Sequence, residues 1–283
     1  MGPRLEGVAR TERRSIQEIK DVPDLRVATQ AVLFQLADDD MVIGFRDQEW
    51  LGLAPHIEED VAFGSIAQEE IGHAAHYYEL LSQLDLGSRD DLASLRPAEE
   101  RRNSVLLERP NGLGTYLESP HFDWAFTIMR HYFHDVWEMR CLGALTQSAA
   151  IELGLAADKI LAEKRYHRAH QELWIKTMLD RGDEQSQERV KKALADTNEW
   201  AADLPDFGGQ ECLFEETRIV PGASTLSTSF WQEIDAFTGA LGLPRPSGTV
   251  TRLNGRRGQH TPALQEALEV WSEVYRLEPG AQW

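Results

Sequence analysis

The spacing of the apolar residues is the feature that most limits the fold of this chain. From about Leu25 onward, apolar residues recur at intervals of three and four, and strand-like alternation is rare. This period places them on one face of an α-helix. Pro55 suits a helix start, and Pro120 and Gly154 delimit the next two helices. The pattern predicts four long helices and then three shorter ones, over residues 24–51, 55–84, 121–153, 156–181, 184–202, 228–241 and 262–276.

A long polar connection, residues 87–119, separates the second helix from the third. Four long helices joined in this way match a four-helix bundle with one crossover. We therefore expect an all-α, ferritin-like bundle over about 24–181, with C-terminal helices over about 184–283 that cap or extend it. Residues 21–283 would form one domain, and the polar residues 1–20 a flexible N-terminal arm.

Composition excludes several classes of protein. The 283 residues carry a net charge of −18, which argues against a nucleic-acid partner because such proteins need a basic face. No apolar run approaches the ~18 residues of a membrane span, and the N-terminus lacks the apolar region of a signal peptide. Cys141 and Cys212 cannot form a disulfide framework. These features favour a cytoplasmic protein in a reducing compartment.

Acidic residues and histidines interrupt the apolar stripes of the first two helices. Asp40 shares a helix face with Leu36 and Ile43, and a buried aspartate there is costly unless it is paired or bound to a metal. Glu70 and His73 stand three residues apart, so they lie on one face of the second helix. In di-iron bundles two helices each give a carboxylate, and the other two each give a Glu-x-x-His pair.

The second half of the bundle repeats this layout. Asp135 lies on the stripe of the third long helix, and His167 on that of the fourth. Asp40 precedes His73 by 33 positions, and Asp135 precedes His167 by 32. We interpret this near-equality as an internal repeat that places two carboxylate and histidine sets at matching heights.

One position of the repeat carries the wrong chemistry for a metal ligand. Lys164 stands three residues before His167, where a glutamate would complete the set. A protonated lysine has no lone pair to give a metal, but its ammonium could replace the charge of one ion. Glu163 could substitute as the ligand. The sequence therefore allows a modified di-metal site holding iron, a single-metal site, or a salt-bridge cluster without metal.

We do not expect the neighbouring acidic residues and histidines to bind metal. We expect Asp38 and Asp39 to face solvent or to cap the chain. His134 should point away from the metal face. Glu138 should pair with a neighbouring basic residue. His76 and His170, each three residues after a candidate ligand, are expected in supporting positions.

A basic cluster stands out in the otherwise acidic chain. Arg252, Arg256 and Arg257 lie in the loop RLNGRRGQH, residues 252–260. Guanidinium groups suit phosphate or a carboxylate-rich surface. The loop is therefore a candidate contact for a phosphate or for a partner protein, or else a solvated loop.

These residues belong to segments that resemble a known family. The chain is similar to the phenylacetate-degradation oxygenases, the 1,2-phenylacetyl-CoA epoxidases, and most of all to their C-type subunits. The resemblance runs from about Leu36 to Trp283. It is carried by the segments DDDMVIGFRDQEWLGLAPHIEEDVA (38–62), LLERPNG (106–112), RHYFHDVWE (130–138), EKRYHRAH (163–170), NGRRGQHT (254–261) and PGAQW (279–283).

The resemblance implies a multicomponent monooxygenase that adds one oxygen atom of O₂ across the ring of phenylacetyl-CoA. In this family a catalytic A-type subunit holds two iron ions, and the C-type subunit supports it, having lost ligands. A small B-type subunit bridges the pairs, and a reductase supplies electrons. A C-type chain alone is expected to form a homo-oligomer. If the CoA phosphates contact this chain, Arg252, Arg256 and Arg257 are the candidates.

This sequence departs from the C-type pattern at one place. The segment QEEIGHAA, residues 68–75, resembles the catalytic subunit rather than the degenerate stretch common in C-type chains. By this resemblance Asp40, Glu70, His73, Asp135 and His167 match metal positions, and Lys164 takes the sixth. The first hypothesis is a supporting subunit with either a partial metal site or no bound metal. The second is an active di-metal oxygenase or oxidase. A third, with little support from the loops, is a ferritin-like protein that handles metal without oxygenation.

Overall fold

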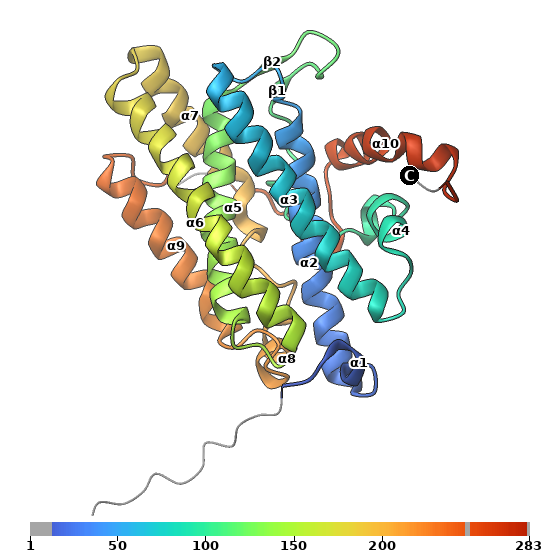
Figure 1. Cartoon of the computed structure of the whole chain (residues 1–283). Helices are drawn as coiled ribbons and strands as arrows, with labels where there is room; N and C mark the ends of the chain where they lie inside the picture. The colour runs from blue at the N-terminus through green and yellow to red at the C-terminus, as the bar shows by residue number, and fades with distance from the viewer. Residues whose placement is uncertain (1–12, 247–249, 282–283) are drawn as a thin grey trace, which may run out of the picture.

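The computed structural model describes residues 13–246 and 250–281, and this part of the chain is mostly helical (Figure 1). The α-helices are α1 (Ile16–Ile19), α2 (Pro23–Gln48), α3 (Ile57–Gln83), α4 (Arg89–Ser94), α5 (Trp124–Leu145), α6 (Ile151–Asp180), α7 (Glu184–Trp200), α8 (Glu211–Glu216), α9 (Ala223–Ala240) and α10 (Pro262–Leu277). Short 3₁₀ turns are η1 (Ala98–Glu100), η2 (Ala201–Asp203) and η3 (Gly255–Arg257). Strands β1 (Gly112–Leu113) and β2 (His121–Phe122) pair antiparallel, with Gly112 opposite Phe122.

Two helical hairpins form the bundle. Helix α2 packs on α3, and α5 packs on α6, with the long crossover between α3 and α5 (Figure 1). Helices α7 and α9 pack against α5, while α10 packs against α4. The predicted all-α, ferritin-like bundle with C-terminal helices is confirmed. No helix in the described residues is long and apolar enough to cross a membrane.

The turn between α5 and α6 lies earlier than the sequence predicted. We expected helices over 121–153 and 156–181, but α5 ends at Leu145 and α6 begins at Ile151. The backbone of the turn bonds elsewhere, because Ala149 accepts from the Arg14 amide and Ile151 donates to the Arg14 carbonyl. Gly154 therefore lies inside α6, where a Cβ would collide with the side chain of Arg13.

The crossover, predicted as a polar connection, is partly buried. Its central part, residues 101–111, runs through the interior, and Val105, Leu106 and Leu107 are fully buried. Asn111 secures it to the bundle by donating to the carbonyl of Arg46 at 2.6 Å. This connection therefore contributes to the core that supports α2.

The predicted flexible arm is wrong for residues 15–20, whereas residues 1–12 lie outside the described part. Ser15 caps α1 through a reciprocal pair of hydrogen bonds with Glu18. Ile16 and Ile19 are both 0% exposed. This segment is therefore packed onto the bundle, where Ile16 also donates its amide to Glu152 of α6 at 2.9 Å.

Asp38 and Asp39 are buried ion-pair partners, which corrects the expectation that they face solvent. Asp38 pairs with Arg96 and Arg101 of the crossover. Asp39 receives two hydrogen bonds from the guanidinium of Arg256, at 2.8 and 2.7 Å. Arg256 is itself 4% exposed. These pairs tie α2 to the crossover and to the C-terminal segment, which explains why polar residues occupy several faces of one buried helix.

Candidate metal centre

Acidic and basic side chains from all four bundle helices meet in the interior. Five of the predicted ligands and the lysine are buried together: Asp40 from α2, Glu70 and His73 from α3, Asp135 from α5, and Lys164 and His167 from α6. They converge because the α2–α3 and α5–α6 hairpins present their repeated positions toward one another. The six residues that the sequence analysis grouped thus lie together in the interior of the bundle.

Lys164 occupies the middle of this centre. Its Nζ lies 2.5 Å from Oε1 of Glu70 and 3.4 Å from Oδ1 of Asp135, and it also contacts Glu138. The side chain is completely buried. A buried ammonium is costly unless it is paired, and here three carboxylates surround it. Lys164 thus brings one positive charge into the middle of three buried carboxylates.

The charges of the centre raise the pKa of Lys164 and lower the pKa of Glu70. Burial lowers the pKa of Lys164, but Glu138, Glu70 and Asp135 outweigh that effect and hold it well above its usual value. Burial raises the pKa of Glu70, but Lys164 and a hydrogen bond from His167 hold it well below its usual value. Both groups are therefore charged at neutral pH, as an ion pair requires.

Asp40 stands apart from this ion pair. Neither carboxylate oxygen has a hydrogen-bond partner, although both are buried. Burial raises the pKa of Asp40 well above its usual value, and the charges of Glu138 and Glu70 raise it further. Without a cation, the Asp40 carboxyl therefore favours its protonated, neutral form, and a cation bound there would displace that proton.

His134 and Glu138 belong to the centre, contrary to the predictions made for them. Nε2 of His134 lies 3.6 Å from Oδ1 of Asp40 and 3.7 Å from Oε2 of Glu138. Both residues are buried, and burial holds the pKa of His134 well below its usual value. Glu138 does pair with a basic residue, but that residue is Lys164 across the bundle rather than a neighbour on its own helix.

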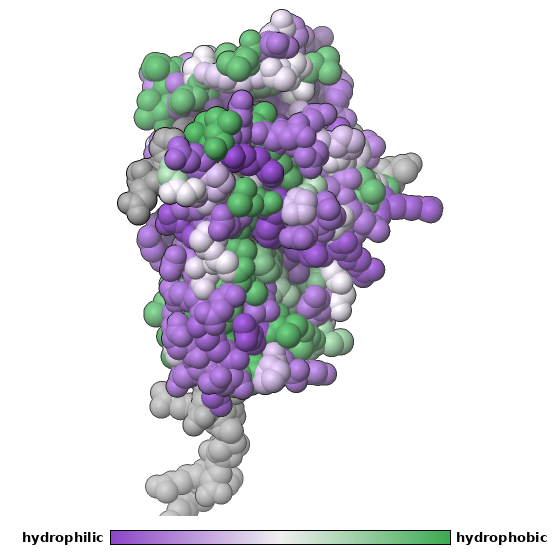
Figure 2. Space-filling view, turned by 90° about the vertical axis from the view of Figure 1, so that its right-hand side faces the viewer, coloured by the Kyte–Doolittle hydropathy of each residue, from purple (hydrophilic) through white to green (hydrophobic). Residues whose placement is uncertain are grey.

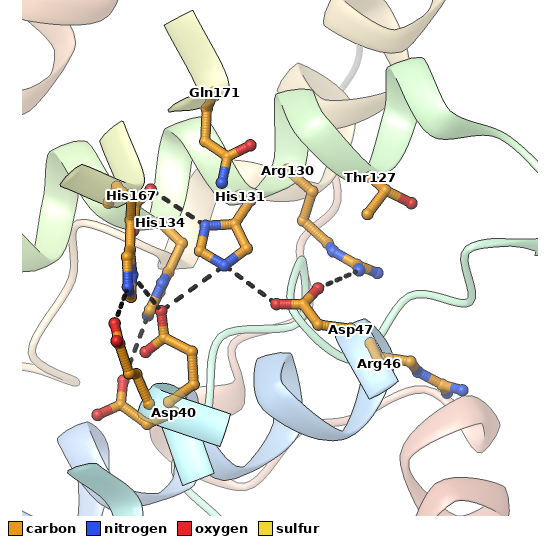
Figure 3. A network of polar contacts seen from close by, with 12 residues as sticks. Asp40, Arg46, Asp47, Thr127, Arg130, His131, His134, His167 and Gln171 are labelled. Atoms are coloured by element: carbon orange, nitrogen blue, oxygen red, sulfur yellow. Dashed lines mark hydrogen bonds and ion pairs between the residues drawn. The ribbon is translucent and has the colours of Figure 1, made fainter. Parts of the chain in front are cut away.

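His131 links the centre to a second buried acid (Figure 3). Its Nδ1 lies 3.1 Å from Asp135, and its Nε2 lies 3.0 Å from Asp47 and 3.6 Å from Glu70. Burial lowers the pKa of His131, but Asp135 and Asp47 outweigh burial and raise it to about 10. His131 is therefore an imidazolium held between two carboxylates.

Two carboxylates at the bundle surface join the helices of the centre crosswise. Glu163 of α6 lies 2.7 Å from Nε2 of His73 on α3. Glu69 of α3 lies 2.6 Å from Nε2 of His167 on α6. A pocket of about 610 Å³ opens beside them between α3 and α6, lined in part by His76. Glu163 is thus a partner of a candidate ligand in this structure.

The remaining predicted residues lie away from the centre. His170 pairs with Glu59 at 2.7 Å, and His76 is exposed on α3. Arg252 and Arg257 are exposed, so they remain available for a phosphate or a partner. Arg256 is not available, because Asp39 occupies its buried guanidinium.

The donor set fits one divalent cation on Asp40, Glu70 and His73. One ligand atom from each of these residues lies within 4.8 Å of the others. The two Asp40 oxygens, Oε2 of Glu70 and Nδ1 of His73 have no hydrogen-bond partner, although Nδ1 of His73 and Oε2 of Glu70 lie 3.5 Å apart as an ion pair. The three residues thus turn these donor atoms toward one another. Carboxylate and imidazole suit a first-row transition metal. Other groupings of this kind among the described residues combine Glu70, His131, His134 and Asp135, or Asp40, His134 and Glu138.

The sequence interpretation missed the part that His131, His134, Glu138, Glu69 and Asp47 play here. A signal existed for two of them: His131 and Glu138 lie one helical turn on either side of Asp135 and thus share its face. Glu69 immediately precedes Glu70, as Glu163 precedes Lys164, and this adjacency is part of the same repeat. The Glu69–His167 and Glu163–His73 pairs depend on the distance between α3 and α6, which the local sequence pattern does not predict.

Comparisons with known proteins agree with the geometry. Residues 15–283 match the family model described as phenylacetic acid catabolic protein. The chain is also similar to the C subunit of the 1,2-phenylacetyl-CoA epoxidase of Escherichia coli (strain K12), at 28% identity over 254 residues that cover 89% of this chain and 98% of that protein. With a family match over nearly its whole length and a ferritin-like bundle around buried acids and histidines, the chain belongs to the phenylacetic acid catabolic protein family.

Proposed function

We propose that this chain is the C-type subunit of a multicomponent phenylacetyl-CoA epoxidase. In this role it supports a catalytic di-iron A-type subunit, together with a small B-type subunit and a reductase, in the cytoplasm. Its similarity to a C subunit over 89% of the chain supports this assignment. The substrate and the partners follow from that similarity rather than from the chain's own pockets.

Lys164 is the observation that carries the proposal. Its ammonium lies among Glu70, Asp135 and Glu138, where a catalytic bundle would need a carboxylate ligand. An ammonium there repels a second metal ion and already neutralises the acids. The chain therefore keeps the folded core of a di-iron protein without the full ligand set.

A partial metal site remains beside the lysine. Asp40, Glu70 and His73 would hold one ion, and their atoms without hydrogen-bond partners support this assignment. Iron bound there would supply redox chemistry to the subunit. The protein residues would fix the ion by charge and orient His73 through its hydrogen bond to Glu163.

Metal content tests the partial site. The purified chain, expressed in iron-rich medium, should hold fewer iron ions than a full di-iron subunit by elemental analysis. Lys164→Glu should raise the iron content, because it restores the missing carboxylate. Lys159→Glu is the matched control, since Lys159 is exposed on the same helix and lies beside the surface pocket. Equal iron content in both variants would count against the partial site.

Assembly tests the supporting role separately. The chain should co-purify with the catalytic A-type subunit of the same epoxidase as a stable complex, and alone it should behave as a homo-oligomer by light scattering. If the two subunits fail to associate when they are co-expressed, the supporting role is wrong whatever the metal content.

A second candidate function is that of an active di-metal oxygenase or oxidase. The unpaired donor atoms of Asp40, Glu70 and His73 favour it. This function requires the isolated, iron-loaded chain to consume O₂ with a chemical reductant at a rate above free iron. Absence of that activity in a chain with measured bound iron would eliminate it.

A further inference from the structure

A second cavity lies at one end of the bundle, next to the candidate metal centre. Its volume is about 780 Å³, and its walls come from the end of α2, the start of α3, the β1–β2 loop and α10. This volume falls in the usual range for small-molecule sites. Figure 2 shows the side of the molecule that carries α10, where hydrophobic residues gather at the upper end of a mostly hydrophilic surface.

Five aromatic side chains line the cavity, namely Phe45, Trp50, Phe63, Tyr116 and Phe122. Trp50 and Phe63 are 5% and 1% exposed, so they form a fixed wall. Phe122 packs edge-on against Trp50, with ring centroids 5.5 Å apart. Tyr116 of the β1–β2 loop and Val270 of α10 line the cavity from the outer side. Such a lining favours an aromatic or other flat apolar molecule.

The charged groups at the cavity are predominantly acidic. Asp47, Glu49, Asp60 and Glu266 line it, against a single guanidinium, Arg46, among the lining residues. That guanidinium is already occupied, because it lies 3.0 Å from Glu49 and donates to the carbonyls of Glu108 and Ala263. Asp47 is paired with His131 and Arg130, and Glu49 with Arg46, so the net negative charge at the cavity comes from Asp60 and Glu266. An anionic ligand would be repelled by these two carboxylates.

We propose that this cavity is a binding site for an uncharged aromatic molecule. Contact with the accessible side chains of Tyr116, Leu117 and Val270, over the buried wall of Trp50 and Phe63, provides the affinity.

The net negative charge of Asp60 and Glu266 selects against acids and phosphates. The cavity adjoins the metal centre, because Asp47 lines it and also pairs with His131 at 3.0 Å. This proposal does not depend on the epoxidase assignment, because it concerns a ligand of the isolated chain.

Two matched probes test the selectivity. 2-Naphthamide and 2-naphthoate share one aromatic body, but only the second is an anion at about pH 7.5, far above the pKa of a carboxylic acid. In isothermal titration calorimetry with the full-length chain, the amide should bind saturably. The acid should bind at least about tenfold more weakly, a difference of about 1.4 kcal/mol.

Two matched variants of α10 test the location. Val270→Trp fills the cavity from its outer wall, at a residue that is 64% exposed and thus tolerant of a larger side chain. It should weaken 2-naphthamide binding at least about tenfold. Val274→Trp is the control, because Val274 lies one turn further on, is 58% exposed and is not among the lining residues. It should leave the affinity within about twofold.

Four outcomes would overturn the proposal. The first is that 2-naphthamide shows no saturable binding. The second is that 2-naphthoate binds as tightly as the amide. The third is that both tryptophan variants bind 2-naphthamide like the original chain. The fourth is that Val270→Trp blocks association with the catalytic partner while neither probe binds, which would make the cavity part of a protein interface. If the chain fails to assemble with the catalytic subunit, the supporting role is wrong, but the binding of 2-naphthamide to the isolated chain should be unaffected.

Discussion

Nζ of Lys164 lies 2.5 Å from Oε1 of Glu70, where the repeat between the two hairpins would place a second carboxylate. The ammonium also contacts Glu138 and lies 3.4 Å from Asp135. One buried ammonium is thus paired with three carboxylates at the middle of the bundle, and it contributes the positive charge that these buried acids need.

Removal of this cation should destabilise the protein strongly. Lys164→Met keeps the length of the side chain but leaves Glu70, Glu138 and Asp135 without their counter-charge. Breaking one partner of a buried ion pair costs about 3–5 kcal/mol. We expect a loss of this size in the free energy of unfolding, measured by urea denaturation and circular dichroism near neutral pH.

The control is Lys159→Met on the same helix. Lys159 is exposed, so its loss should change the stability by no more than about 0.5 kcal/mol. A divalent metal should restore part of the stability of Lys164→Met, because it binds only the folded state. If the two methionine variants prove equally stable, Lys164 does not neutralise the centre.

Local periodicity was sufficient to predict the bundle and much of the centre. Asp40 and the Glu70–His73 pair could be identified because a polar residue on an apolar helix stripe is costly to bury unless a partner or an ion compensates it. Lys164 stood out through its place in the repeat. These predictions depend on the spacing of residues along the sequence, which can be read without knowing the tertiary structure.

Interactions between distant segments could not be predicted in the same way. Asp39 was expected to face solvent because its partner Arg256 lies 217 residues away. The turn after Leu145 was misplaced because Arg14, far away in sequence, pairs with its backbone. Likewise, Glu69 pairs with His167 only because the packing of the two hairpins brings α3 beside α6. Each of these features depends on tertiary packing rather than on local pattern.

The imidazolium of His131 should make the stability depend on pH. Asp135 and Asp47 raise its pKa to about 10 in the folded state, against about 6.5 in an unfolded chain. The folded state therefore binds the extra proton between these values, and its stability should fall as the pH rises through this window. Urea denaturation at about pH 6.5 and about pH 9.5 measures the change.

His131→Gln isolates this contribution. The stability difference between the original chain and the variant should be largest at about pH 6.5 and should shrink toward about pH 9.5. His56→Gln, at an exposed histidine that lies away from the centre, should show no such trend. A difference that stays constant over the whole range would mean that His131 is neutral in the folded protein.

The buried arginine of the C-terminal loop should be structural rather than a ligand contact. Arg256→Ala leaves Asp39 buried without its partner, which costs about 3–5 kcal/mol. Arg257→Ala, at the exposed neighbour, should cost no more than about 0.5 kcal/mol. Limited proteolysis should also cut the segment before α10 faster in Arg256→Ala only. Equal proteolysis of the two variants would show that the Asp39–Arg256 pair does not hold this segment.

The N-terminal helix α1 should contribute measurably to the stability of the bundle. Ile16→Ala removes a fully buried side chain and should cost about 2–4 kcal/mol in the free energy of unfolding. Val27→Ala is the control, because Val27 is 51% exposed on α2 and should cost less than about 0.5 kcal/mol. Urea denaturation of both variants measures the two losses in the free energy of unfolding. Similar small losses would mean that α1 separates from the bundle in solution, as the flexible-arm interpretation of the sequence predicted.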